Sequence, residues 1–214
     1  MVWLVRHGQS ESNAGAPCAL PGESPLTTTG WAQARLVATA MTEQPTMIVT
    51  SRYLRARQTA IPATQRFPAA PLTEWPVEEF TYLGSLHGRL MTNEERRPWA
   101  RAYWTAADPY DVQSPHSESF ADMIARADAF VRRVRELPAG FFLVCTHGVF
   151  MTAVVWTLSE SRSHAVMDMR AFLDFQKSLR IANGSIIRLN PWSRMTVTAR
   201  DAAVDHLPAH LVTR

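Results

Sequence analysis

Two histidines occur in nearly the same sequence context, each between an apolar run and a glycine. His7 follows residues 2–5 in LVRHGQS, and His147 follows residues 141–145 in FFLVCTHG. Apolar runs of this length are typical of buried strands, and residues just beyond strand ends often carry the chemistry of a protein. LVRHGQS taken alone also fits a surface turn. The repetition of the pattern favours a shared functional site for the two histidines.

A third apolar run, MIVTS, is followed by three arginines, Arg52, Arg55 and Arg57. Histidines and arginines without a carboxylate cluster repel one another unless an anion lies between them. Arginine forks, backbone NH groups and helix N-termini all suit phosphate oxygens. An imidazole can also attack phosphorus and form a phosphohistidine. The predicted chemistry is therefore phosphoryl binding or transfer; a metal site is the competitor, which the flanking arginines disfavour.

The elements that must position these residues alternate between strand and helix. This order predicts an α/β fold, a doubly wound and mainly parallel sheet sandwiched by helices. Residues 185–189 and 195–199, joined through NPWS, are expected to form an antiparallel hairpin at one edge. The other predicted strands are 2–6, 46–50, 72–77 and 141–146, and the predicted helices are 29–43, 54–66, 119–136, 149–158 and 165–175. Parallel strands would bring both histidines to one edge of the sheet.

Local signals refine this outline. Pro62 predicts that helix 54–66 ends or kinks there. Ser117 and Glu118 form a helix cap before residues 119–136. The chain is interpreted as a single domain, residues 1–214, with a helical insertion at about residues 82–116 that covers the site.

Composition limits the class of protein. With 46% hydrophobic and 19% charged residues, the chain reads as globular, and no apolar run reaches the roughly 20 residues of a membrane span. No secretory leader is visible, so a cytoplasmic protein without membrane contact is expected. The net charge is only +3 and the arginines are scattered, which argues against nucleic acid. Cys18 and Cys145 form no disulfide framework and no metal motif, and Cys145 fits the core. Seven tryptophans leave a homodimer open.

A family resemblance is carried by three motifs that occur in this order: L-V-R-H-G-Q-S-E-S-N, S-R-Y-L-R-A-R-Q-T-A and T-H-G. Together they resemble the histidine phosphatase superfamily, in its phosphoglycerate-mutase-like branch, from Leu4 to about Leu189. The resemblance implies a doubly wound α/β fold, a phosphohistidine intermediate, a small phosphorylated substrate, and neither a metal nor an organic cofactor. By position, His7 matches the family nucleophile and Arg6 its phosphate-binding neighbour. His147 matches the second pocket histidine.

The second motif selects one arginine among three. The family arginine lies four residues after the serine, which is Arg55, so Arg52 and Arg57 are expected at the surface or in salt bridges. Asn13 and Gln9 match positions near the phosphate. Gly148 and Ser119 complete the expected substrate-contacting set, although Ser119 also lies at the start of a helix. His116 replaces the usual glycine of the family's G-E-S-F stretch.

The general acid is expected to be Glu79, with Glu78 as its rival. The family places a glutamate four residues before the first glycine of a G-x-x-G or G-x-x-x-G segment. In PVEEFTYLGSLHGR that register falls on Phe80, and a one-residue bulge would bring Glu79 into place. In the insertion, Arg89, Arg96, Arg97 and Tyr103 could contact the rest of the substrate, although a solvated helical face is the simpler interpretation for each.

The favoured function is a metal-independent phosphomonoester hydrolase in which Arg6, His7, Arg55, His147 and Glu79 are catalytic. A phosphoglycerate-type mutase is the alternative with the same chemistry, and the shifted glutamate register disfavours it. A catalytically weak protein that binds a phosphorylated ligand is the alternative from another class. The sequence does not identify the leaving group.

Overall fold

A mixed sheet forms the centre of the protein. A computed structural model describes residues 1–159, 167–191, 196–197 and 202–213, and in it six strands follow the order β3-β2-β4-β1-β5-β6. The parallel part of the sheet consists of β1 (Val2–Arg6), β2 (Met47–Thr50), β3 (Leu72–Glu74) and β4 (Phe142–Thr146). The antiparallel part consists of β5 (Ile186–Asn190), which pairs with β1, and β6 (Thr196–Val197). The predicted antiparallel hairpin is thus confirmed, with residues 195, 198 and 199 outside the described residues.

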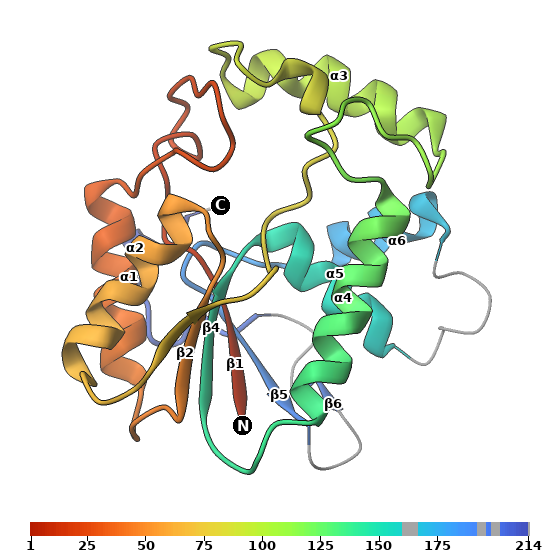
Figure 1. The fold of residues 1–214 in the computed structure, drawn as a ribbon. Coiled ribbons are helices and arrows are strands. Elements are labelled where there is room, and N and C mark those ends of the chain that lie inside the picture. The colour runs from red at the N-terminus through yellow and green to blue at the C-terminus, as the bar shows by residue number, and fades with distance from the viewer. Residues whose placement is uncertain (160–166, 192–195, 198–201, 214) are drawn as a thin grey trace.

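Helices cover both faces of this sheet, as predicted (Figure 1). On one side lie α1 (Thr28–Ala40) and α2 (Leu54–Arg66), and on the other lie α4 (Phe120–Arg135), α5 (Gly148–Leu158) and α6 (Met169–Ser178). In the described part of the chain, no helix is long and apolar enough to cross a membrane.

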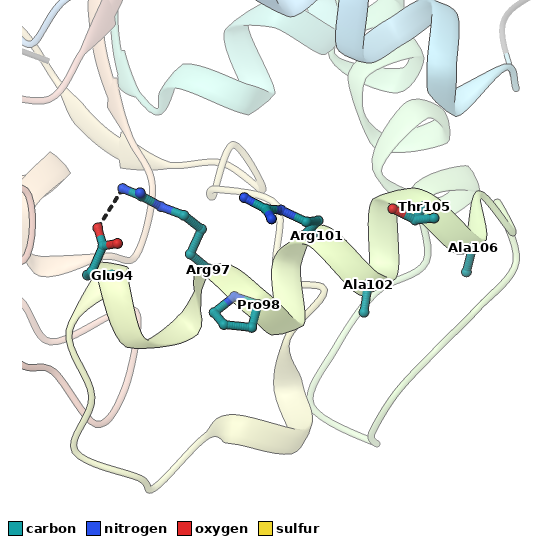
Figure 2. Close-up of a pocket in the computed structure, with 7 residues that line it drawn as sticks. All are labelled: Glu94, Arg97, Pro98, Arg101, Ala102, Thr105 and Ala106. Carbon is teal, nitrogen blue, oxygen red and sulfur yellow. Dashed lines mark ion pairs between the residues drawn. The ribbon is translucent and has the colours of Figure 1, made fainter.

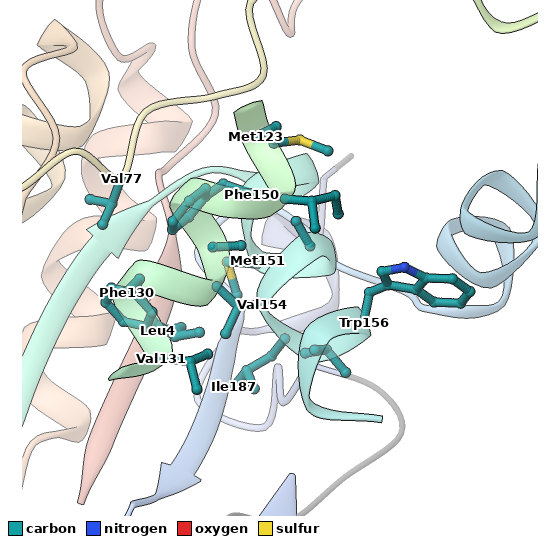
Figure 3. Close-up of a cluster of buried hydrophobic side chains, with 14 of the residues drawn as sticks. Leu4, Val77, Met123, Phe130, Val131, Phe150, Met151, Val154, Trp156 and Ile187 are labelled. Carbon is teal, nitrogen blue, oxygen red and sulfur yellow. The ribbon is translucent and has the colours of Figure 1, made fainter. Parts of the chain in front are cut away.

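The alternation of side chains along the inner strands gives the protein two hydrophobic clusters. In β1, Val2 and Leu4 belong to the cluster under α4 and α5, whereas Trp3 and Val5 belong to the cluster under α1 and α2. Figure 3 shows Leu4 between Val131 of α4 and the side chains of α5. Burying each such side chain stabilises the fold by about 1.5–3 kcal/mol. A strand buried on both faces is continuously apolar, which explains the runs seen in the sequence.

Several predicted boundaries need correction. Helix α2 runs through Pro62 to Arg66, so the helix does not end at the proline; the neighbouring side chains Ala60 and Ala63 are buried and hold it. Strand β3 ends at Glu74 because Pro76 offers no NH to the ladder. Helix α1 ends at Ala40 rather than at residue 43. Helix α6 begins at Met169, after the capping Asp168, and the predicted start at residues 165–166 lies outside the described residues.

The N-terminus of α4 also differs from the prediction. Ser119 is the N-cap and forms a capping box with Asp122, whereas Ser117 bonds to Ser114 and Glu118 pairs with Arg126. The cap prediction for Ser117 and Glu118 is therefore wrong. A carboxylate three residues into a helix can return a bond to the cap NH, and only Ser119 has one at that spacing.

Residues 82–116 contain a helix, as predicted. Helix α3 (Asn93–Ala106) begins with a capping box between Thr92 and Glu95. In Figure 1 it lies at the end of the molecule toward which β1 runs from the N-terminus. Tyr103 of α3 is buried, and its ring lies 6.0 Å from that of Phe80. Aromatic packing thus ties α3 to the segment after β3.

Candidate active site

Three strand ends deliver basic side chains to one edge of the sheet. In the parallel pairing of β1 and β4, Arg6 lies opposite Thr146, so the next residues, His7 and His147, are neighbours. Their ring centroids are 5.1 Å apart, and both side chains are buried. Arg55 reaches the same place from the first turn of α2, which follows β2. The structure therefore brings together the four basic residues that the sequence singled out.

The hydrogen bonds of His7 define its tautomer. The Nε of Arg55 donates to Nε2 of His7 over 3.0 Å, so Nε2 carries a lone pair. The other ring nitrogen, Nδ1, then holds the proton and donates it to the carbonyl oxygen of Gly8 over 2.7 Å. Burial, reinforced by the charges of Arg55 and Arg6, holds the pKa of His7 well below its usual value. His7 is thus a neutral imidazole with an available lone pair on Nε2.

His147 is buried and neutral as well. Burial is the largest cause that lowers its pKa, and the charge of Arg55 is the next. Its Nε2 lies 2.7 Å from the hydroxyl oxygen of Ser51. Its Nδ1 is buried and has no hydrogen-bond partner among the described residues.

The half-buried Arg6 and the buried Arg55 bring two positive charges to the cluster. Arg6 donates from Nη1 to the carbonyl oxygen of Ile181 over 2.7 Å, whereas its buried Nε has no partner among the described residues. Arg55 donates from Nη1 to the carbonyl oxygen of Pro21. Burial lowers the pKa of both arginines, and the negative charge of Glu79 opposes this effect. Unpaired buried donors cost about 1–3 kcal/mol each, so an anion that accepts from them is favoured.

The two candidate glutamates have different surroundings. The carboxylate of Glu79 accepts from the backbone NH groups of Val149 and Phe150, over 3.0 and 3.1 Å, at the N-terminus of α5. It also interacts electrostatically with both site arginines. Glu78 instead pairs with Arg52 at 3.4 Å and lies 3.9 Å from Arg126. Glu79 is the one beside the cluster, while Phe80, on which the family register falls, is buried in the core.

The two residues predicted to lie near the phosphate, Asn13 and Gln9, have different hydrogen-bond partners. Asn13 is held by Asn183, whose Nδ2 donates to Oδ1 of Asn13 over 3.1 Å and to the carbonyl oxygen of His7 over 3.2 Å. The side-chain oxygen of Gln9 accepts from the hydroxyl of Thr27, at the start of α1. Asn13 is thereby linked to the backbone of His7, whereas the amide oxygen of Gln9 accepts a hydrogen bond at the start of α1.

The other residues that the sequence singled out make contacts within the protein itself. A Cβ on Gly148 would lie 3.4 Å from Nε of Arg6, so this glycine packs directly against the arginine. The hydroxyl of Ser119 donates to Asp122 over 2.7 Å as part of the α4 cap. Arg52 and Arg57 pair with Glu78 and Glu74, in agreement with the expectation of salt bridges.

A cavity of about 1080 Å³ lies beside the buried cluster. Tyr53 and Glu79 line it on the side of the sheet, and His87 and His116 line it from the segment that contains α3. The ring of Tyr53 lies 5.2 Å from that of His147, so the cavity adjoins the histidines.

A second cavity, of about 850 Å³, runs along α3 alone (Figure 2). Arg97 and Arg101 point to the same side of the helix, and Arg97 pairs with Glu94 at 2.6 Å.

Of the other insertion residues, Arg96 donates to the carbonyl oxygen of Cys18, and Tyr103 is buried. Tyr103 lines neither of the two cavities.

Sequence reasoning missed two residues of this site. Ser51 contacts His147, and Asn183 joins the His7 carbonyl to Asn13. Ser51 stands directly after a buried strand, at a position equivalent to those of the two histidines, which is a signal that could have identified it. Asn183 lies in the segment ANGS, residues 182–185, just before β5. Nothing in the local sequence indicates that its side chain contacts the backbone at the end of β1.

The fold and the site together define an α/β protein with two histidines and two arginines clustered at the carboxyl ends of its parallel strands. The model of the histidine phosphatase superfamily (branch 1) matches residues 2–193, and the chain belongs to this family. A probable phosphoglycerate mutase of Photorhabdus laumondii is 32% identical over 197 residues, which are 87% of this chain and 90% of that protein. The resemblance inferred from the three motifs is confirmed.

Solved structures share the fold. A putative alpha-ribazole-5'-P phosphatase from Escherichia coli superposes with a TM-score of 0.68 at 21% identity, covering 95% of this chain and 98% of that one. The phosphoserine phosphatase of Entamoeba histolytica, in complex with 3-phosphoglyceric acid, gives 0.73 at 19% identity, covering 97% and 98%. The predicted phosphoglycerate-mutase-like fold is confirmed. The names of these relatives include both phosphatases and mutases.

Proposed function

We propose that this protein is a phosphomonoester hydrolase that works through a phosphohistidine on His7. The observation that carries the proposal is the arrangement of the buried cluster. A neutral His7 with its lone pair on Nε2 lies among two arginines and a second histidine. Among the described residues, two buried nitrogens of this cluster, Nε of Arg6 and Nδ1 of His147, have no hydrogen-bond partner. These are the groups needed to hold a phosphoryl group beside a nucleophile.

The first step forms a bond between Nε2 of His7 and phosphorus and breaks the bond from phosphorus to the ester oxygen. Arg55 exchanges its contact with Nε2 for a phosphoryl oxygen, and Arg6 and His147 bind the other oxygens. Glu79 transfers a proton to the leaving alkoxide. Gly8 keeps the proton of His7 on Nδ1 through its carbonyl, so the attacking nitrogen stays free.

The second step hydrolyses the intermediate. Glu79, now ionised, takes a proton from a water molecule that attacks phosphorus, and the bond from phosphorus to His7 breaks. Inorganic phosphate leaves and the enzyme returns to its starting state. No metal ion is required in either step, because the cations are supplied by the chain. Asn13 and Gly148 support the phosphate pocket in this scheme, with Gln9 and Ser119 in structural contacts beside it.

Hydrolysis is favoured over mutase activity by the charge pairing around the larger cavity. A mutase for phosphoglycerate must bind the substrate carboxylate. The three arginines that line this cavity each have a glutamate partner in the described residues: Arg52 with Glu78, Arg57 with Glu74 and Arg126 with Glu118. The name of the Photorhabdus laumondii relative favours the mutase as the second candidate. Residues 82–116 cover the site in either case.

A panel of phosphomonoesters in excess chelator tests this proposal. The panel contains an aryl phosphate, phosphoserine and 3-phosphoglycerate, and the wild type is compared with His7→Ala. We expect phosphate release that resists the chelator and is lost in the variant. Interconversion of phosphoglycerates without phosphate release would instead identify a mutase. Binding of inorganic phosphate with no turnover of any ester would identify a phospho-ligand-binding protein.

A further inference from the structure

Ser51 is completely buried at the end of β2, and its hydroxyl faces His147. Its oxygen accepts a hydrogen bond from the backbone NH of Tyr53 over 3.3 Å. A hydroxyl has one proton to donate, and the NH of Tyr53 cannot accept it. Among the described residues, the acceptor within reach is Nε2 of His147, at 2.7 Å.

We infer that Ser51 is a positioning residue that fixes His147 in the tautomer with its proton on Nδ1. The hydroxyl proton of Ser51 occupies the lone pair of Nε2, so a neutral imidazole must carry its own proton on the other nitrogen. That nitrogen is buried and has no hydrogen-bond partner in the part of the chain that the structure describes. It is therefore a donor directed at whatever anion fills the pocket.

The tautomer decides whether His147 helps or hinders an anion. With the proton on Nδ1, the ring donates to a phosphoryl oxygen. With the proton on Nε2, a lone pair would face the same oxygen and repel it. Protonation of both nitrogens would give the same donor, but the ring is buried beside Arg6 and Arg55, which disfavours a further positive charge. Ser51 thus gives a neutral histidine the hydrogen-bonding character that a charged one would have.

The role of Ser51 in binding a phosphoryl group rests on the proposed function. The tautomer of His147 can be measured without any turnover. Long-range proton–nitrogen correlation spectra of histidine-labelled protein distinguish the two neutral tautomers. The signals of His147 are assigned by their loss in His147→Gln. In the wild type we expect the form protonated on Nδ1. The form protonated on Nε2 would overturn the inference whatever the enzyme does.

Two variants test the role of the hydroxyl. Ser51→Ala removes it, and we expect a mixture of tautomers or the form protonated on Nε2. Ser51→Thr keeps it and should restore the wild-type form. A Ser51→Ala protein with an unchanged Nδ1–H signal would overturn the inference. If Ser51→Ala does not fold, the spectra of the wild type and Ser51→Thr still decide the tautomer.

Inorganic phosphate supplies a readout of function that does not depend on catalysis. Titration of the wild type should shift the Nδ1–H signal of His147, and Ser51→Ala should bind phosphate about tenfold more weakly with a lower kcat on the aryl ester. Equal phosphate affinity and equal kcat in the two proteins would contradict the role. Failure of the wild type to hydrolyse any ester would instead count against the proposed function and leave the tautomer result in place.

Discussion

At the scale of single residues, two adjacent glutamates have different surroundings. Glu79 faces the site arginines and the N-terminus of α5, whereas Glu78 pairs with Arg52. We expect Glu79→Gln to lower kcat by about 10²–10⁴-fold on alkyl phosphates, because the leaving alkoxide then lacks a proton donor. On an aryl phosphate with an acidic leaving group, the first step should be slowed much less, whereas the second step still lacks the base that activates water. Rapid-quench kinetics with both esters measures the first step separately from kcat.

Glu78→Gln is the matched control for that experiment. It should leave kcat within about a factor of three on both esters, since it removes a partly exposed ion pair worth about 1 kcal/mol or less. Equal losses in the two variants would contradict the assignment of Glu79. The sequence allowed Glu79 to be chosen only through a one-residue departure from the family register. Its neighbours on α5, 70 positions along the chain, distinguish it from Glu78.

At the scale of elements, the two glycines that follow the site histidines differ in how closely other chain segments approach. A Cβ on Gly8 would lie 2.4 Å from the carbonyl oxygen of Gly30, where α1 packs against the loop after β1. A Cβ on Gly148 would meet Arg6 at an ordinary 3.4 Å. We expect Gly8→Ala to lower the free energy of unfolding by about 2–3 kcal/mol, because a backbone atom must move.

Gly148→Ala is the comparison, and we expect it to change stability by less than about 1 kcal/mol, since a helical position tolerates alanine. Urea unfolding of the two variants measures both effects. A Gly8→Ala protein as stable as Gly148→Ala would contradict the close packing of α1. The H-G repeat in the sequence could not reveal this difference, because it depends on a helix that begins 20 residues later. The strands and most helices could be predicted, since their periodicity is local.

At the scale of the whole molecule, two neutral histidines are buried under the same positive potential. Both have a pKa well below the ordinary value because of burial and neighbouring arginines. The unfolded chain therefore takes up protons near pH 6.5 that the folded chain does not, and stability falls as the pH drops. From pH 7 to pH 5 we expect each to lower the free energy of unfolding by about 2 kcal/mol.

Urea unfolding at both pH values tests this expectation. His7→Gln should show a smaller decrease than the wild type, by about 2 kcal/mol. His210→Gln, at an exposed position, is the control and should decrease as the wild type does. An unchanged decrease in His7→Gln would contradict the burial of a neutral His7. The charge state is a property of the assembled site, since no single motif in the sequence indicates that all four basic groups lie together.

The proposed phosphohistidine on His7 can be trapped directly. The wild type is mixed with an excess of aryl phosphate in the presence of chelator and quenched with alkali within one turnover, because a phosphohistidine survives alkali and is hydrolysed by acid. Peptide mass spectrometry then locates the phosphate. We predict a phosphate on His7 that is absent from His7→Ala and accumulates in Glu79→Gln when the second step is slowed. Turnover with no phosphate on His7, or with phosphate on another residue, would contradict the account.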